Sequence, residues 1–82
     1  MSDTGSAATV QDRSPEEASL VRMANQIADN AAYLPHDDAV ARVAAHLRDF
    51  WHPSMRAVLL AYVDGGGAGL DPVPLEALDR LR

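Results

Sequence analysis

The pattern of apolar and polar residues follows the period of an α-helix in three separate stretches of the chain. In the first stretch, apolar residues recur at intervals of mainly three and four: Leu20, Met23, Ala24, Ile27, Ala31 and Leu34. The preceding residues have the order of a capping box, with Ser14 at the N-cap, Pro15 at the first helical position and Glu17 two residues later. We therefore expect a helix that begins after Ser14 and ends near Leu34, because Pro35 cannot continue it.

The second stretch predicts a helix that begins at Asp37 and Asp38, whose charges suit the positive end of a helix dipole. Its apolar stripe consists of Val40, Val43, Ala44, Leu47 and Trp51, with Phe50 on the flank. His52 precedes Pro53 and is biased away from helical backbone angles, so the helix should end at Trp51. We expect Trp51 to lie in the core, where it anchors this helix to the next one.

The third stretch, from Pro53 to about Asp64, is apolar on almost every side. One stripe consists of Met55, Val58, Leu59 and Tyr62, and the opposite side carries Ala57, Leu60 and Ala61. A helix of this kind is normally buried on both sides. Two interpretations stay open: the helix is central and covered by its own neighbours, or one side faces a second protein.

The remainder of the chain predicts a glycine-rich connection and a short last helix. The run Gly65–Gly69 follows a helix rather than a strand, and no Lys-Ser/Thr pair comes after it, so a helix C-cap is favoured over a phosphate loop. Asp71 and Pro72 then begin a helix that carries Leu75, Leu78 and Leu81. The whole pattern predicts an all-α fold, a small bundle of three amphipathic helices plus a short C-terminal helix.

The chain divides into a tail and one domain. Residues 1–13 are mostly small and polar, with Val10 as the one sizeable apolar residue after Met1, so we expect a disordered N-terminal tail. Residues 14–82 should form a single helical domain, since 82 residues are near the lower size limit for a stable core. The first residues do not resemble a secretory signal, and no apolar run is long enough to cross a bilayer. We therefore expect a cytoplasmic protein that does not bind membranes.

Composition excludes several kinds of chemistry. The chain has no Cys, which excludes thiolate metal sites and a Cys nucleophile, and its net charge of −5 argues against nucleic-acid binding. The histidines His36, His46 and His52 are the obvious reactive candidates, but the last two are six residues apart and do not share a helix face. We predict no catalytic residue, no cofactor-binding residue and no metal ligand.

A partner surface is the remaining candidate for function. The face of the first helix opposite the apolar stripe carries Arg22, Gln26, Asp29 and Tyr33, flanked by Asn25 and Asn30. Amides and a hydroxyl lose less free energy on desolvation than charges do, which suits a contact face, although a plain solvated face fits as well. We also expect Arg56 to reach outward from the third helix. The predicted partner-binding residues are Arg22, Asn25, Gln26, Tyr33, Arg56 and Leu60.

Two stretches carry a resemblance to a known family. They are Leu20-Val21-Arg22-Met23-Ala24-Asn25-Gln26-Ile27 and the corner Phe50-Trp51-His52-Pro53-Ser54-Met55-Arg56, which is followed by the run from Leu59 to Leu70. Together they closely resemble the delta subunit of the NAD-dependent, molybdenum-containing formate dehydrogenases, the FdsD-like family. The resemblance extends from about Leu20 to Leu81.

The resemblance implies a non-catalytic accessory subunit of a cytoplasmic complex in which other subunits oxidise formate to carbon dioxide and reduce NAD. In that family a large subunit carries the molybdenum cofactor and iron–sulfur clusters, and the delta subunit carries none. The chain would dock on this large subunit and aid complex stability, cofactor insertion or both. Two alternatives stay open from the residues alone: a small helical DNA-binding regulator, and an interaction module that forms a homodimer.

Overall fold

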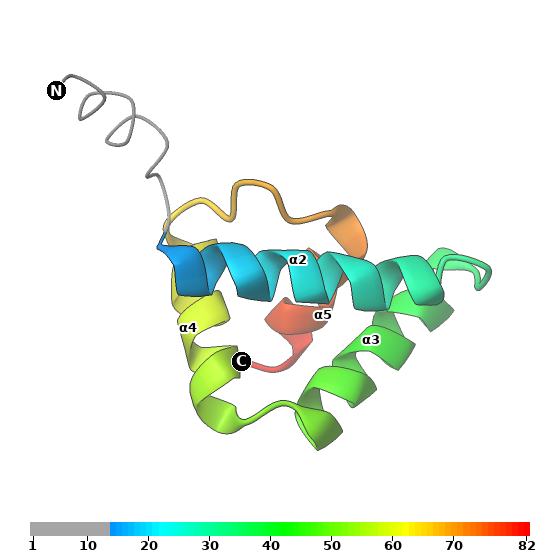
Figure 1. Cartoon of the computed structure of the whole chain (residues 1–82). Helices are drawn as coiled ribbons and strands as arrows, with labels where there is room; N and C mark the ends of the chain where they lie inside the picture. Colours follow the sequence, from blue (N-terminus) through cyan, green and yellow to red (C-terminus); the bar gives the residue numbers. More distant parts are fainter. Residues whose placement is uncertain (1–13) are drawn as a thin grey trace, which may run out of the picture.

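The computed structural model describes residues 14–82, which form four α-helices and no strand. The helices are α2 (Pro15–Asn30), α3 (His36–Phe50), α4 (Pro53–Asp64) and α5 (Pro72–Arg80). In Figure 1, α2 lies across one side of the molecule, α3 and α4 extend from its two ends, and α5 lies between them. The predicted all-α fold is therefore confirmed. The predicted tail, residues 1–13, lies outside the described residues.

The first helix begins as predicted and ends earlier. Ser14 and Glu17 form the capping box: the Ser14 N–H donates to Glu17 Oε1 at 2.9 Å, and the Glu17 N–H donates to Ser14 Oγ at 3.1 Å. The predicted end near Leu34 is wrong, because α2 ends at Asn30 and the next residues form turns. Ala31 is still buried and Leu34 still packs against the core, so the apolar period continues past the end of the helix.

The buried face of α2 is rotated from the predicted stripe. Leu20 and Ala24 are buried as expected, but Val21 and Ala28 are buried too, while Met23 is 42% exposed. The reason is tertiary: α2 contacts α3, α4 and α5, and these three helices together determine which arc of α2 is covered. Placing Met23 in the core was therefore wrong.

The core lies where α3 meets its neighbours. Trp51, placed in the core by its spacing, is indeed buried, with 6% of its surface exposed. Residues from all four helices complete the buried cluster: Leu20, Val21, Ala24, Ala28, Ala31, Ala39, Val40, Val43, Ala44, Leu47, Leu59, Ala77 and Leu78. Within the predicted stripe of the last helix, Leu78 is fully buried whereas Leu75 is 36% exposed.

The C-terminal end of α4 requires glycine. The helix runs from Pro53 to Asp64 as predicted. The Gly66 N–H donates to the Val63 carbonyl at 2.9 Å and the Gly67 N–H donates to the Tyr62 carbonyl at 3.0 Å, the pair of bonds of a Schellman motif. Gly66 has a φ of 130° and Gly67 has a φ of 65°, backbone angles that residues other than glycine adopt only at a cost in free energy.

Burial separates α4 from the other helices. Leu59 is its one fully buried residue, whereas Met55, Val58, Leu60 and Tyr62 are half-buried. Ala57 and Ala61 are exposed. Within the described chain, α4 is therefore not covered on both sides. None of the helices in residues 14–82 has both the length and the apolarity needed to cross a bilayer.

Candidate partner interface

The corner between α3 and α4 is built from two helix caps. Trp51 and His52 have extended backbone angles, which end α3 and redirect the chain into α4. His52 Nδ1 accepts a hydrogen bond from the Ser54 N–H at 3.2 Å and so caps the start of α4. Pro53 follows at the first helical position, where its missing N–H has no intrahelical partner to lose.

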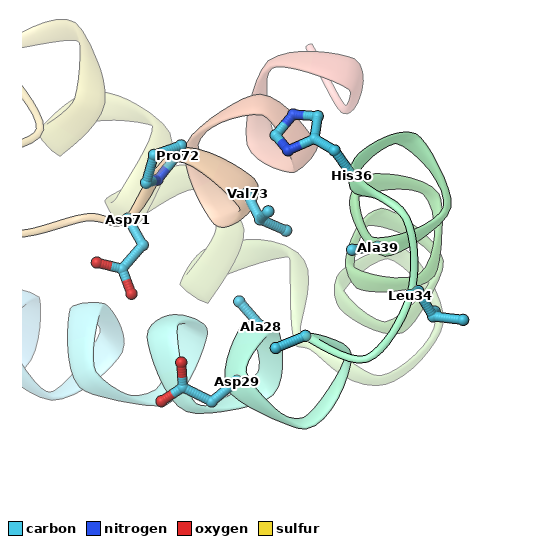
Figure 2. A pocket seen from close by; sticks show the side chains of 9 residues that line it. Ala28, Asp29, Leu34, His36, Ala39, Asp71, Pro72 and Val73 are labelled. Atoms are coloured by element: carbon cyan, nitrogen blue, oxygen red, sulfur yellow. The ribbon is translucent and has the colours of Figure 1, made fainter.

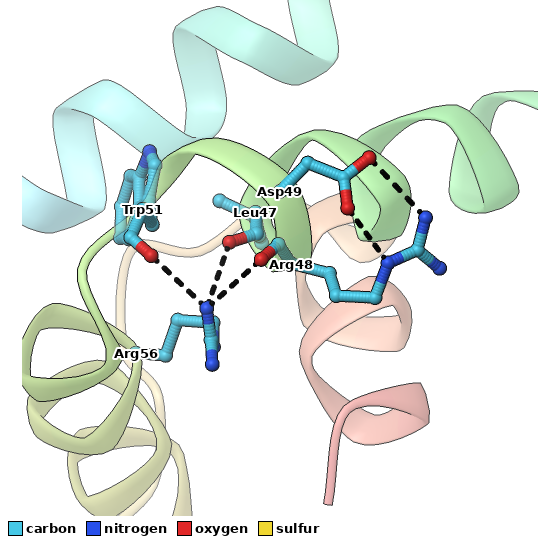
Figure 3. A network of polar contacts seen from close by, with 5 residues as sticks. All are labelled: Leu47, Arg48, Asp49, Trp51 and Arg56. Carbon is cyan, nitrogen blue, oxygen red and sulfur yellow. Dashed lines mark hydrogen bonds and ion pairs between the residues drawn. The ribbon is translucent and has the colours of Figure 1, made fainter.

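Arg56 belongs to the same corner and folds back instead of reaching outward. Its Nη1 donates to the carbonyl oxygens of Leu47 at 3.2 Å, Arg48 at 3.2 Å and Trp51 at 3.0 Å, as Figure 3 shows. These carbonyls lie at the C-terminal end of α3, where a positive charge is favourable, and the Leu47 carbonyl also accepts the Trp51 N–H at 3.2 Å. The prediction that Arg56 reaches outward is therefore wrong.

Asn25 also has partners within the chain. Its Nδ2 donates to the Gly69 carbonyl at 2.8 Å, and its Oδ1 accepts the Asp71 N–H at 3.0 Å. Both ends of the amide are thus occupied by the loop that joins α4 to α5. The physical effect is to hold this loop against α2, a role that the local sequence pattern could not reveal.

The other predicted partner residues lie at the surface in two places. Arg22 and Gln26 are exposed on α2, and Tyr33 is 74% exposed in the turn that follows it. Leu60 is half-buried on α4, packed in part against the core. Arg22 and Gln26 thus lie four residues apart on α2, Tyr33 lies in the following turn, where its hydroxyl is 3.5 Å from Arg42 Nη1, and Leu60 lies on a separate helix.

Two further exposed residues were not predicted as partner contacts from the sequence. Phe50 is 76% exposed, and its ring lies 5.0 Å from the ring of His46, tilted by 44°. Met23 is the second, because the helical period placed it in the core. Exposed large apolar side chains that lie together commonly mark contact with another protein. The position of Phe50 on the flank of the apolar stripe was the one sequence feature that could have indicated its exposure.

A hollow of about 370 Å³ lies where the end of α2 meets the starts of α3 and α5. Figure 2 shows its apolar lining from Ala28, Ala39 and Val73, with the carboxylates of Asp29 and Asp71 nearby. His36 also lines it, but its Nε2 lies 2.7 Å from Glu76 Oε2 and is engaged there. The hollow is at the small end of the range for ligand sites, and the residues that line it do not form a nucleophile–base arrangement.

The ion pairs are at the surface and perturb ionisation only locally. Arg48 donates to Asp49 through Nε at 2.9 Å, and this hydrogen bond lowers the pKa of Asp49. Arg82 Nη2 lies 2.6 Å from Asp64 Oδ1 and likewise lowers the pKa of Asp64. Across residues 14–82, no three His, Asp or Glu side chains gather closely enough to hold a metal ion.

Comparison with known proteins identifies the family. A family model described as NADH-dependant formate dehydrogenase delta subunit FdsD matches residues 19–78 of the 82 residues. The chain belongs to this family. The FdsD match contains both stretches on which the resemblance was based, Leu20–Ile27 and Phe50–Arg56. It makes the chain a delta subunit of an NAD-dependent formate dehydrogenase, and hence one member of a complex with other subunits. No curated protein and no solved structure matches the chain.

Proposed function

We propose that this delta subunit is a non-catalytic accessory subunit that docks on the large, molybdenum-containing subunit of a cytoplasmic formate dehydrogenase. There it stabilises the assembled complex, aids insertion of the molybdenum cofactor into the large subunit, or does both. Oxidation of formate and reduction of NAD take place on the other subunits.

The observation that carries the proposal is the open side of α4. This helix has a largely apolar sequence, yet Leu59 is its one fully buried residue and Leu60 is only half-buried. Apolar helix surface that its own chain leaves uncovered is stabilised when another protein covers it. Because the chain belongs to a family of complex subunits, the large subunit is the partner that we propose.

The polar part of the proposed contact comes from α2 and the turn after it. Arg22, Gln26 and Tyr33 are exposed and can form hydrogen bonds with a partner. Asn25 and Arg56 contribute indirectly, since their hydrogen bonds hold the loop before α5 and the corner before α4 in place. The proposed direct contacts are therefore Arg22, Gln26, Tyr33 and Leu60.

Co-purification tests this surface. The variant that combines Leu60→Asp with Arg22→Glu should remain helical by circular dichroism but should no longer co-purify with an affinity-tagged large subunit. A matched control combines Leu75→Asp with Arg80→Glu, the same chemical changes on α5, and should co-purify normally. Retention of the first variant at the wild-type level would reject α2 and α4 as the docking surface.

A second experiment separates an assembly factor from a resident subunit. The large subunit is purified from cells with and without this chain, and its molybdenum content is measured by mass spectrometry. A lower molybdenum content without the chain supports a role in cofactor insertion. Equal molybdenum content, together with faster dissociation of the complex on dilution, supports a stabilising role instead.

The open side of α4 also favours one alternative, a homodimer of the isolated chain. Two copies that cover each other's α4 would bury the same apolar surface as a partner subunit does. Light scattering over a range of protein concentrations measures this association. A dimer that persists in the presence of the large subunit would count against docking through α4.

A further inference from the structure

A groove runs between α2 and α3, beside the exposed side chains of Met23 and Phe50. It consists of two adjoining hollows of about 290 and 160 Å³, which share Ile27, Asn30 and His46. We call this the α2–α3 groove. It is lined by Met23, Gln26, Ile27, Asn30, Ala31, Arg42, His46 and Trp51.

The groove has an apolar floor and apolar side chains at one end. Buried Trp51 and half-buried Ile27 form part of the floor, so the base of the groove belongs to the rigid core. Met23 is 42% exposed on the α2 side, and Phe50, 76% exposed, packs on His46 on the α3 side. A rigid floor flanked by exposed Met and Phe is typical of a surface that accepts an apolar side chain from a partner.

The charge of the groove is opposite to that of the whole chain. The chain has 12 acidic residues and a net charge of −5. No carboxylate within residues 14–82 lines the groove, whereas Arg42 and His46 do. Within residues 14–82, Arg42 forms no ion pair, and its Nη1 has a long contact of 3.5 Å with the Tyr33 hydroxyl. Asp38 lines a neighbouring hollow together with Arg42. Among the described residues, Arg42 is therefore a cation at the groove with no carboxylate paired to it.

The length of the groove suits a helical occupant. Arg42 and His46 line it from one face of α3, which ends at Phe50, and Met23 and Ile27 line it from α2. Eight residues of helix rise about 12 Å, so the groove has the length of roughly two turns of a helix lying in it. Recognition of this kind places an amphipathic helix in a groove with anchors at intervals of three and four.

We propose that the α2–α3 groove binds an amphipathic helical segment of the large formate dehydrogenase subunit whose carboxylates face Arg42. The proposal rests on the proposed function and specifies the chemistry of the contact. The segment supplies apolar anchors to the floor beside Met23 and Trp51, and Asp or Glu side chains to the rim. The chain's own residues 1–13 offer fewer such anchors, because Met1 and Val10 are the sizeable apolar residues among them.

Site-specific photo-crosslinking in the complete complex tests the proposal. Phe50 is replaced by p-benzoylphenylalanine, the complex is irradiated, and the linked peptide is identified by mass spectrometry. The same replacement at Leu75 on α5 provides the control. In parallel, Arg42→Glu is compared with Arg80→Glu, which makes the same charge change at an exposed position on α5.

The expected result is a crosslink from position 50 to a carboxylate-bearing amphipathic segment of the large subunit, with no such link from position 75. Arg42→Glu should weaken the complex at least about tenfold, while Arg42→Lys and Arg80→Glu should leave affinity within about twofold. A crosslink from position 50 to residues 1–13, to a second copy, or to a segment without carboxylates would overturn the inference. So would unchanged affinity of Arg42→Glu in a complex that still forms.

Failure of this inference is distinguishable from failure of the proposed function. If the wild-type chain does not co-purify with the large subunit, the proposed function fails and the groove proposal fails with it. If the wild-type complex forms and Arg42→Glu binds as tightly as wild type, only the groove proposal fails.

Discussion

Helices α3 and α4 are neighbours in the chain and are both rich in apolar residues, yet they are buried to very different extents. α3 buries Ala39, Val40, Val43, Ala44 and Leu47 within 15 residues. α4, with 12 residues and a more continuous apolar sequence, buries Leu59. The difference follows from packing, because α3 packs closely along α5 and also contacts α2, whereas α4 contacts the same two helices less extensively in total.

The comparison separates two uses of apolar surface. In α3 it holds the chain together, and a polar side chain in the buried stripe would unfold it. In α4 the large apolar side chains pack in part against the core, while Ala57 and Ala61 are exposed, so part of its apolar surface is left uncovered by this chain. The two aromatic residues at the end of α3 repeat the contrast at closer range, since Trp51 is 6% exposed and Phe50 is 76% exposed.

Trp51 and Phe50 give the largest predicted contrast. Trp51→Ala should lower the free energy of unfolding by about 3–5 kcal/mol, the range for emptying a large buried aromatic site. That is comparable to the total stability expected of so small a core, so the variant should be largely unfolded at 25 °C. Phe50→Ala should change the stability by less than about 0.5 kcal/mol. Urea unfolding followed by circular dichroism measures both, and a well-folded Trp51→Ala variant would contradict the assignment of Trp51 to the core.

Leu59 and Leu60 test the two sides of α4 directly. Leu59→Ala should cost about 2–5 kcal/mol, because Leu59 is fully buried and its removal leaves a cavity. Leu60→Ala should cost about 1 kcal/mol, since part of its side chain already contacts water. Urea unfolding followed by circular dichroism measures the loss of stability in both variants. An equal cost at both positions, measured at low protein concentration, would show that the outer side of α4 is covered by the chain itself.

Arg56 tests the connection between the two helices. Arg56→Met keeps much of the side-chain length but removes the donors to the three carbonyls at the end of α3, and should cost about 1–3 kcal/mol. Arg48→Met removes an exposed ion pair with Asp49 and should change the stability by at most about 1 kcal/mol. Thermal unfolding of the two variants side by side provides the measurement. Equal melting temperatures would mean that the Arg56 cap contributes nothing.

The smallest effect concerns the pH dependence at the exposed end of α4. The hydrogen bond from Arg82 holds the pKa of Asp64 below its usual range, so the folded state binds this proton more weakly than the unfolded state. The resulting stabilisation is present above the unfolded-state pKa and is lost as the pH falls through the folded-state pKa. Asp64→Asn should therefore be slightly less stable than wild type at neutral pH and equal to it in strong acid. Urea midpoints at the two pH values check the sign.

Much of the fold could be predicted because its signals are local. Pro15 and the Ser14–Glu17 box determine where α2 begins, and Pro53 and the Gly65–Gly67 run bound α4. Trp51 could be assigned to the core because it continues the buried stripe of α3. In each case the residue acts within a few positions of itself, so the sequence pattern contains the whole cause.

What could not be predicted depends on contacts between distant segments. The exposure of Met23 follows from how the other three helices pack around α2. The end of α2 at Asn30 could not be predicted, because Ala31 and Leu34 continue the apolar period of the helix into the turn. Asn25 and Arg56 were predicted as partner contacts because polar residues on a helix surface have no visible partner in the sequence. The α2–α3 groove could not be found either, since it needs the relative placement of two helices.

The two hydrogen bonds of Asn25 give the molecule a built-in probe of its own folding. The Asp71 N–H donates to the side chain of Asn25, which lies 46 positions earlier in the sequence, on the first helix of the domain. Deuterium can replace this proton when α2 separates from the loop before α5. In an exchange experiment by NMR, the protection of the Asp71 amide therefore reports how often the first helix detaches, and its change on adding the large subunit measures how firmly assembly holds that helix in place.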